Sequence, residues 1–319
     1  MKRLVFSFFL FSILVIMSGC GEAAKVSSTE KKAALLLEST FDDQGWNKKG
    51  YDSLLHLKSD LNMEVTYEEN INTPAAAAEI IQKLDERNFG LIIGHGQIFA
   101  EYFSAIRDSY PQIQFVAMNG EGAGDNVTTL QFDGYAMGYF AGRLAGQMSE
   151  TQTIGVIGAK KWQPEVEGYI EGAATTSTDL NIKNEIVNGW DDKEGAFEAL
   201  DSMLEADADI VYPAGDGFHV EVIKKLKEKD RYAIGYVGEQ SDLGESTVLT
   251  STIQHVDKLY RIAADEFLAG TLDSGTHTYD FAEDAISLGN FSPAVPDELQ
   301  EQLTEEIEEY KTTGKLPGQ

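Results

Sequence analysis

The sequence predicts an α/β protein of two lobes, each with a parallel β-sheet covered by helices. From residue 33 onward, short apolar stretches alternate with longer segments of helical periodicity. The stretch 33–37 is apolar at every position, which is typical of a strand buried on both faces. The alternation starts again after a helix at 133–148, so the chain contains two similar units. We expect a ligand to bind between them, at the carboxyl ends of the strands.

The elements follow in a regular order. After the first strand, residues 47–61 predict a helix and 63–67 a strand, and Thr73-Pro74 starts a helix that runs to residue 84. The first unit continues with a strand at 90–93, a helix at 98–109 and a strand at 114–117. In the remainder of the chain, strands are predicted at 153–157, 185–187, 209–212, 232–236 and 248–252, and helices at 163–176, 194–206, 219–228, 256–269 and 297–310.

The helix at 133–148 carries a glycine at every fourth position, at 134, 138, 142 and 146. This spacing is found where two helices dimerise in a membrane. Arg143 and Gln147 interrupt the apolar surface, and they favour the alternative, close packing of the helix on a sheet.

Residues 1–20 have the features of a lipoprotein signal peptide. Lys2 and Arg3 form a basic start, 4–17 is almost wholly apolar, and the segment ends in Met17-Ser18-Gly19-Cys20, with the only cysteine of the chain. The apolar run of about 14 residues is shorter than the roughly 20 that a spanning helix needs, which favours cleavage over an uncleaved signal anchor. Lipid on Cys20 would hold the protein on the extracytoplasmic face of the cell membrane.

These features divide the chain into four parts. Residues 1–19 are the predicted signal peptide and 20–32 a lipidated tether. The N-terminal lobe is predicted to comprise 33–131 plus about 244–277, and the C-terminal lobe 132–243 plus about 278–319.

The charge of the chain argues against direct nucleic-acid binding. The formal net charge is −28, and without Lys2 and Arg3 the chain has 23 basic against 53 acidic residues. Such a surface repels phosphates. A single cysteine also excludes an intramolecular disulfide.

The sequence contains none of the common catalytic motifs. A nucleophile elbow, a Walker loop and His or Cys pairs at metal-ligand spacing are all missing, so we expect no enzyme activity, no metal and no cofactor. The pairs Asp42-Asp43 and Asp191-Asp192 could serve as general acids, but their loop positions favour helix capping.

Aromatic, amide and carboxylate side chains follow the predicted strands instead. This candidate ligand site comprises Asp43, Trp46, Asn47, His95, Asn119, Asp216, Phe218 and Gln240. A planar polar ligand would stack on Trp46 while the polar groups bind its edge. For each residue the alternative is an ordinary loop position, and His95, between two glycines, either faces the ligand or only forms a turn.

Several short motifs in register resemble the basic membrane protein family. They are Asp-Asp-x-x-Trp-Asn (42–47), Gly-His-Gly (94–96), Tyr-Pro-x-x-x-Phe-Val (110–116), Asp-Asn-Val (125–127), Ala-Met-Gly-Tyr-Phe-Ala-Gly (136–142), Ile-Gly-Val-Ile-Gly (154–158), Tyr-Pro-Ala-Gly-Asp-Gly (212–217) and Val-Leu-Thr-Ser-Thr (248–252). Members are lipoprotein substrate-binding proteins of ABC transporters, including purine nucleoside receptors. Residues 162–166 and 233–237 resemble more closely a branch described as positive regulators of competence gene expression.

The resemblance implies a type I periplasmic-binding-protein fold: two Rossmann-like lobes joined by a three-crossover hinge, which close on a ligand. In its nucleoside-binding members the base stacks at the position of Trp46, beside Asn47. Trp162, Tyr212 and Gln254 also belong to the candidate ligand site. An aspartate and a lysine that hold the sugar match Val237 and Gln254, and another aspartate matches Asn119.

Valine at position 237 cannot accept a hydrogen bond from a sugar hydroxyl as a carboxylate does. Either the ligand differs from an ordinary nucleoside, or the protein no longer serves transport. We therefore expect a non-catalytic, lipid-anchored solute-binding protein that regulates competence gene expression indirectly. The expected partners are a small polar or aromatic ligand and a membrane permease or membrane-bound regulator. The alternatives are an ABC-transporter receptor for a nucleoside and, more remotely, a direct DNA-binding activator.

Overall fold

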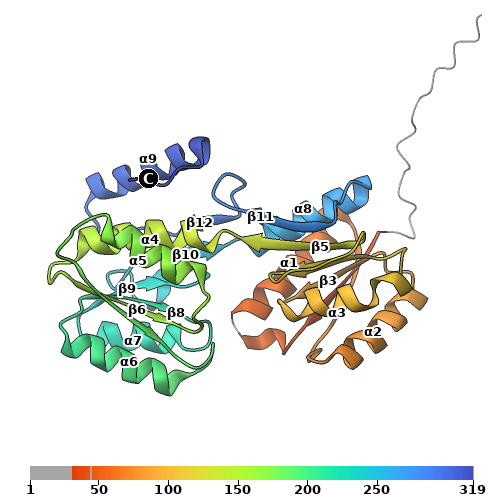
Figure 1. The fold of residues 1–319 in the computed structure, drawn as a ribbon, viewed down its shortest axis with the longest axis horizontal. Helices are drawn as coiled ribbons and strands as arrows, with labels where there is room; N and C mark the ends of the chain where they lie inside the picture. Colours follow the sequence, from red (N-terminus) through yellow and green to blue (C-terminus); the bar gives the residue numbers. More distant parts are fainter. Residues whose placement is uncertain (1–30, 44, 319) are drawn as a thin grey trace, which may run out of the picture.

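A computed structural model describes residues 31–43 and 45–318 and places them in two lobes side by side (Figure 1). In this part of the chain, each lobe holds one six-stranded sheet. Within the described residues, the backbone crosses between the lobes three times, after β5 (Val127–Phe132), β10 (Val248–Gln254) and β11 (Gly275–Tyr279). The predicted type I periplasmic-binding-protein fold is confirmed.

The N-terminal lobe has an all-parallel sheet. Its strand order is β11, β5, β4 (Gln114–Met118), β3 (Leu91–His95), β1 (Lys32–Leu37) and β2 (Glu64–Glu68). Helices α1 (Trp46–Leu61) and α8 (Val256–Ala269) cover one face, and α2 (Pro74–Glu86) and α3 (Ile98–Ile106) the other. Along β1, Leu35 and Leu37 enter the first core and Ala34 and Leu36 the second. This double burial explains why 33–37 is apolar throughout.

The C-terminal lobe repeats the arrangement. Its strand order is β12 (Ile286–Leu288), β10, β9 (Tyr232–Gly235), β8 (Ile210–Ala214), β6 (Thr153–Gly158) and β7 (Asn181–Ile186), with β12 antiparallel to β10. Helices α4 (Gly134–Met148) and α5 (Pro164–Ala174) cover one face, and α6 (Lys193–Glu205) and α7 (His219–Glu228) the other (Figure 1). The last helix, α9 (Asp297–Thr313), contacts α4 through an ion pair, in which Arg143 of α4 donates to Glu306 of α9 at 2.6 and 2.7 Å.

The predicted lobe boundary after residue 243 is wrong for one strand. Residues 244–277 are predicted to lie in the N-terminal lobe, but β10 pairs in parallel with β9 and antiparallel with β12. The backbone crosses over only after Gln254, so α8 and β11 alone return to the N-terminal lobe.

The predicted signal peptide at 1–19, Cys20 and most of the tether at 20–32 lie outside the described residues. Among the residues that are described, no helix has both the length and the apolar character needed to span a membrane.

Strands at the sheet edges were the hardest to predict. The strand predicted at 185–187 is β7, which lies at 181–186, and β11 and β12 have no predicted counterpart. All three are edge strands with mostly half-buried or exposed side chains. A strand with so few buried positions gives little apolar periodicity. The strand β5 of the N-terminal lobe also has no predicted counterpart, although it is mostly buried.

The glycines of α4 face a helix, which corrects the prediction that they pack on a sheet. A Cβ atom on Gly138 would lie 2.0 Å from the carbonyl oxygen of Glu165, and one on Gly142 would lie 2.0 Å from that of Tyr169. On α5, Gly168 and Gly172 approach the backbone of α4 in the same way. The spacing therefore marks two helices of one lobe in backbone contact.

Candidate functional site

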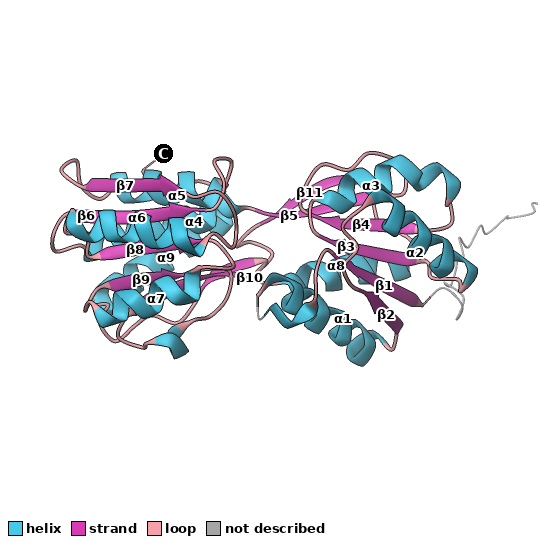
Figure 2. Cartoon of the chain, turned by 90° about the horizontal axis from the view of Figure 1, so that it is seen from below, coloured by secondary structure: helices cyan, strands magenta, loops and turns pink. Residues whose placement is uncertain are grey.

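Two polar contacts join the lobes at the amino end of α1. The amide of Trp46 donates a hydrogen bond of 3.1 Å to Oδ2 of Asp216, which follows β8. One helical turn later, Nζ of Lys49 donates at 3.3 Å to the carbonyl oxygen of Gln254, the last residue of β10. We call Trp46, Lys49, Asp216 and Gln254 the interlobe contact. Figure 2 shows the start of α1 beside the tip of β10.

Gly45 allows this approach. A Cβ atom at this position would lie 2.5 Å from both carboxylate oxygens of Asp216, closer than real Cβ atoms come to their neighbours. The loop before α1 and the loop after β8 therefore meet because residue 45 has no side chain.

The indole ring of Trp46 rests on His95. The two rings stack with centroids 4.2 Å apart and an interplanar angle of 18°. Nε2 of His95 donates at 2.8 Å to the carbonyl oxygen of Trp46, and Nδ1 lies 2.9 Å from the hydroxyl of Tyr260. Because a carbonyl only accepts, these bonds fix the tautomer of the imidazole. His95 is fully buried, and its ring lies against the indole of Trp46.

Lys49 places an ammonium group in a half-buried position between the lobes. Burial lowers the pKa of Lys49, while the charges of Asp257 and Asp216 oppose that shift. Sequence reasoning missed this residue. The available signal was its position three residues after Trp46, which puts both side chains on one face of α1.

Three further predicted residues lie in the core of the C-terminal lobe. Tyr212 is fully buried, with its hydroxyl 3.1 Å from Oγ1 of Thr252, and burial raises the pKa of Tyr212. The ring of Phe218 packs against Gly215 and is 1% exposed. The side chain of Gln240 accepts at 3.0 Å from the amide of Tyr236 and is 9% exposed. All three side chains lie inside the lobe, behind the strand-end loops. Their contact with a ligand stays a prediction.

Val237 has an unusual backbone conformation. Its φ is +64°. Its two neighbours form a tight turn around it, in which the amide of Gly238 donates to the carbonyl oxygen of Tyr236 at 2.8 Å. A positive φ is rare for a β-branched residue, and such strain is commonly stored at functional sites. The amide of Gln254 donates to the Val237 carbonyl oxygen at 3.1 Å, so this turn is joined to the interlobe contact.

The remaining predicted residues occupy different positions. Asn119 is half-buried with a φ of +66°, and Asn47 is half-buried at the start of α1. Trp162 is 58% exposed after β6, and its ring packs edge-on against Trp190 at 6.0 Å. The side chain of Asp43 lies outside the described part of the structure.

The acidic pair at 191–192 has a capping role. Oδ1 of Asp192 accepts from the amide of Gly195 at 3.0 Å and Oδ2 from that of Asn188 at 3.0 Å. These bonds lower the pKa of Asp192. The carboxylate thus caps α6, as the loop position favours, and the general-acid alternative loses support.

A buried polar network lies behind the strand-end loops of the C-terminal lobe. Oε1 of Glu165 accepts from the hydroxyl of Tyr236 and from Nε2 of Gln163, both at 2.9 Å. The same Nε2 donates to the carbonyl oxygen of Ala214 at 2.9 Å. The network connects the ends of β6, β8 and β9. Glu165 lies in the segment 162–166, and its buried position in this network could not be predicted from that motif.

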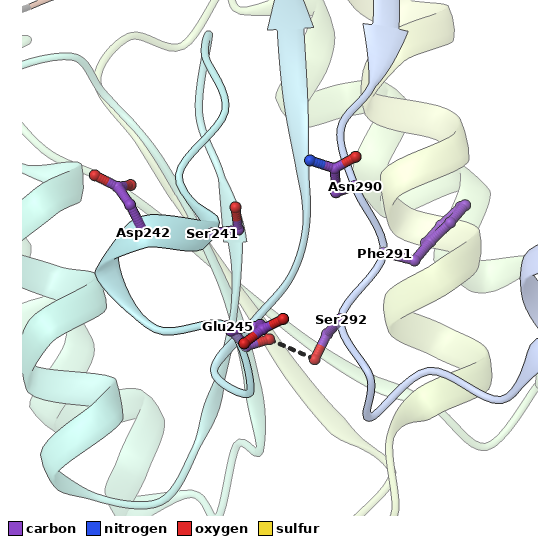
Figure 3. A pocket seen from close by; sticks show the side chains of 6 residues that line it. All are labelled: Ser241, Asp242, Glu245, Asn290, Phe291 and Ser292. Carbon is purple, nitrogen blue, oxygen red and sulfur yellow. Dashed lines mark hydrogen bonds between the residues drawn. The ribbon is translucent and has the colours of Figure 1, made fainter.

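One shallow cavity of about 360 Å³ lies away from the interlobe contact. It is bounded by the turn η3 (Ser241–Leu243) and the segment after β12, where the hydroxyl of Ser292 donates to the carbonyl oxygen of Glu245 at 2.7 Å (Figure 3). Its lining residues are Ser241, Asp242, Glu245, Asn290, Phe291 and Ser292. Among the described residues, no group of three or more His, Cys, Asp or Glu side chains is placed to hold a metal ion.

Comparisons with known proteins agree with this architecture. The Bmp family model, described as ABC transporter substrate-binding protein PnrA-like, matches residues 30–319. The chain is 42% identical over 308 residues to transcriptional activator protein Med of Bacillus subtilis, covering 97% of each chain. It is 24% identical over 332 residues to ABC transporter nucleoside-binding protein BmpA of Lactococcus lactis, covering 92% of this chain and 93% of the relative.

A solved structure shows the same similarity in three dimensions. The crystal structure of a transcriptional activator of the comK gene from Bacillus halodurans matches with a TM-score of 0.85 and 46% identity, covering 90% of this chain and 99% of that one. The resemblance seen in the sequence motifs is thereby confirmed. The chain belongs to the Bmp family of PnrA-like ABC transporter substrate-binding proteins.

Proposed function

We propose that this chain is a lipid-anchored solute-binding protein on the extracytoplasmic face of the cell membrane. It holds a planar polar ligand of the nucleoside class between its lobes and does not transform it. The observation that carries the proposal is the interlobe contact, in which loops from the carboxyl ends of both sheets meet at Trp46 and Asp216. In open α/β folds this is the position at which ligands bind.

The chemistry of the contact suits such a ligand. Asp216 supplies a carboxylate, Lys49 an ammonium group and Gln254 an amide, and Trp46 adds an aromatic surface. We assign Asn47 and Asn119 to the same site, with His95, Tyr212, Phe218 and Gln240 as supports behind it. The name of the nucleoside-binding relative supports the ligand class. Because residue 237 is a valine, the sugar must be bound differently from the way the family resemblance implies.

Thermal denaturation tests ligand binding. A ligand that binds only the native state stabilises it by about 2.7 kcal/mol at a concentration 100 times its dissociation constant. Inosine, guanosine, adenosine and cytidine at millimolar concentration should therefore raise the melting temperature, and Trp46→Ala should abolish the shift. Leu55→Ala, at a 39% exposed position of α1, is the control. If no nucleoside shifts the wild-type protein, the nucleoside proposal is wrong.

The anchor is tested separately. Cys20→Ser should release the protein from the membrane fraction of cells, because it removes the proposed lipid attachment site. A variant that still sediments with membranes would contradict lipid anchoring and would favour an uncleaved signal anchor.

A second function is favoured by the similarity to proteins named as transcriptional activators. We propose that the chain regulates competence gene expression indirectly, through a membrane permease or a membrane-bound regulator that responds to its ligand. The excess of acidic residues supports an indirect route. A gel-shift experiment at physiological salt tests this point, because nanomolar, sequence-selective DNA binding would overturn it.

A further inference from the structure

Trp162 exposes an unusually large apolar surface at the carboxyl end of the second sheet. Its side chain is 58% exposed, against 39% for Leu55 and 36% for Tyr67, the other large apolar side chains exposed among the described residues. Tryptophan in such a position commonly marks a binding surface, since burying its ring is highly favourable.

The loop that carries Trp162 is held firmly. The next residue, Gln163, is 3% exposed and accepts from the amide of Lys160 at 2.7 Å. Its amide nitrogen donates to Ala214 and to the buried Glu165, both at 2.9 Å. The indole is therefore exposed on a fixed support, which lowers the entropy cost of binding.

A second tryptophan supports the ring from the side. Trp190, after β7, meets Trp162 edge to face, with centroids 6.0 Å apart and an interplanar angle of 70°. In an edge-to-face pair, the edge of one ring contacts the face of the other. The contact with Trp190 therefore holds the ring of Trp162 in one orientation.

The pair is continuous with the interlobe contact. The carbonyl oxygen of Trp190 accepts from the amide of Gly217 at 2.8 Å, and the preceding residue, Asp216, accepts from the amide of Trp46 at 3.1 Å. A continuous series of contacts thus leads from Trp162 to the place where the lobes meet. By contrast, His95 already covers one face of the Trp46 ring.

We infer that Trp162 is the residue on which the aromatic ring of the bound solute stacks, with Trp190 as its support. Trp46 keeps its place in the site, and its amide joins the lobes. The inference rests on the proposed function, because it assigns a platform within that binding site.

The test compares four variants by calorimetric titration with inosine: Trp162→Ala, Trp162→Leu, Trp162→Phe and the control Leu55→Ala. Stacking of a base on an aromatic side chain contributes about 1–3 kcal/mol, so Ala and Leu should each weaken binding by at least about tenfold. Phe should retain affinity within about threefold, and Leu55→Ala should match the wild type. The melting temperature of each variant without ligand shows whether it is folded.

The outcomes separate the inference from the function on which it rests. If the wild type binds inosine and Trp162→Ala binds it equally well, the stacking role is overturned while solute binding stands. If Trp162→Leu binds as well as Trp162→Phe, the contact is apolar and not stacking, which also overturns the inference. If the wild type binds none of the four nucleosides, the proposed function fails, and the inference fails with it.

Discussion

The hydroxyl of Tyr310 donates a hydrogen bond of 2.9 Å to Oδ2 of Asp280, which ties α9 to the crossover that follows β11. The same hydroxyl lies 3.5 Å from Oδ2 of Asp133, the N-cap residue of α4. The amide of Asp133 donates to the carbonyl oxygen of Tyr279 at 2.8 Å. One side chain of the last helix therefore connects two of the segments about which the lobes must hinge.

Tyr310→Phe should loosen this connection. Burial raises the pKa of Tyr310, and the two carboxylates add to the shift, so the hydroxyl remains a donor at neutral pH. Hydrogen bonds to charged groups contribute about 1.5–3 kcal/mol, and we expect a loss of about that size in the free energy of unfolding, measured by urea denaturation.

Tyr102→Phe is the matched control, because that hydroxyl donates to the Asn72 carbonyl oxygen at the protein surface. Equal losses in the two variants would show that the position of Tyr310 at the hinge has no special importance.

Gly45→Ala should break the hydrogen bond between Trp46 and Asp216. The added Cβ atom would lie 2.5 Å from the carboxylate, so Asp216 must move away. We expect hydrogen exchange at the Trp46 amide to accelerate by about tenfold or more, as the loss of a charge-assisted bond implies. Mass spectrometry of the peptide that contains Trp46 measures this.

Gly189→Ala is the control, since its Cβ atom would meet only Oδ1 of Asp191 at 3.5 Å. Unchanged exchange at Trp46 in Gly45→Ala would mean that the interlobe contact tolerates a side chain and is not tightly formed.

The sequence predicted the lobes well because their central strands are buried on both faces. The run at 33–37 is the clearest case, and it lies within β1. The exact hinge was less predictable. Val248 to Gln254 could belong to either sheet on apolar pattern alone, and only pairing with β9 settles the choice.

The candidate site was predicted only in part. An aromatic residue after a strand has the same sequence pattern whether it faces inward, as Phe218 does, or outward, as Trp162 does. Glycines distinguish the buried rings from the exposed ones. A Cβ atom on Gly215 would lie 2.1 Å from the Phe218 ring, and one on Gly50 would lie 2.8 Å from His95. A glycine opposite an aromatic ring thus indicates a buried ring, but the opposition itself depends on the fold.

Gly138→Ala should destabilise the C-terminal lobe. The new Cβ atom would lie 2.0 Å from a backbone oxygen of α5, which cannot rotate away, so the helices must separate. Overpacking of this kind costs about 1–3 kcal/mol, more than the about 1 kcal/mol that alanine contributes through helix propensity. Urea denaturation should show the loss.

Gly146→Ala provides the control on the same helix. Its nearest neighbour would be Oγ1 of Thr176 at 2.3 Å, the end of a side chain that can change rotamer. We expect a smaller loss there. If the two variants are equally stable, backbone contact between α4 and α5 is not what selects glycine at position 138.

Lys49 should give the stability of the protein a specific pH dependence. Burial lowers its pKa below the value of 10.5 that the unfolded chain is expected to have. Between the folded and unfolded pKa values the unfolded state binds more protons, so this group makes the free energy of unfolding rise with pH. Below the folded pKa, the native state bears the full cost of the buried charge. Lys49→Met removes the titration, so wild-type stability should increase relative to the variant as the pH rises toward 10.5.

Lys83→Met serves as the control. Its hydrogen bond to Glu79 raises the pKa of Lys83 above 10.5, so any contribution of that lysine is lost only above pH 10.5. Below that pH, the difference in stability between wild type and Lys83→Met should stay constant. Urea denaturation at several pH values between about 7 and 10 measures both differences. If the difference between wild type and Lys49→Met stays constant across this range, the Lys49 ammonium is hydrated, and the interlobe contact is open to water.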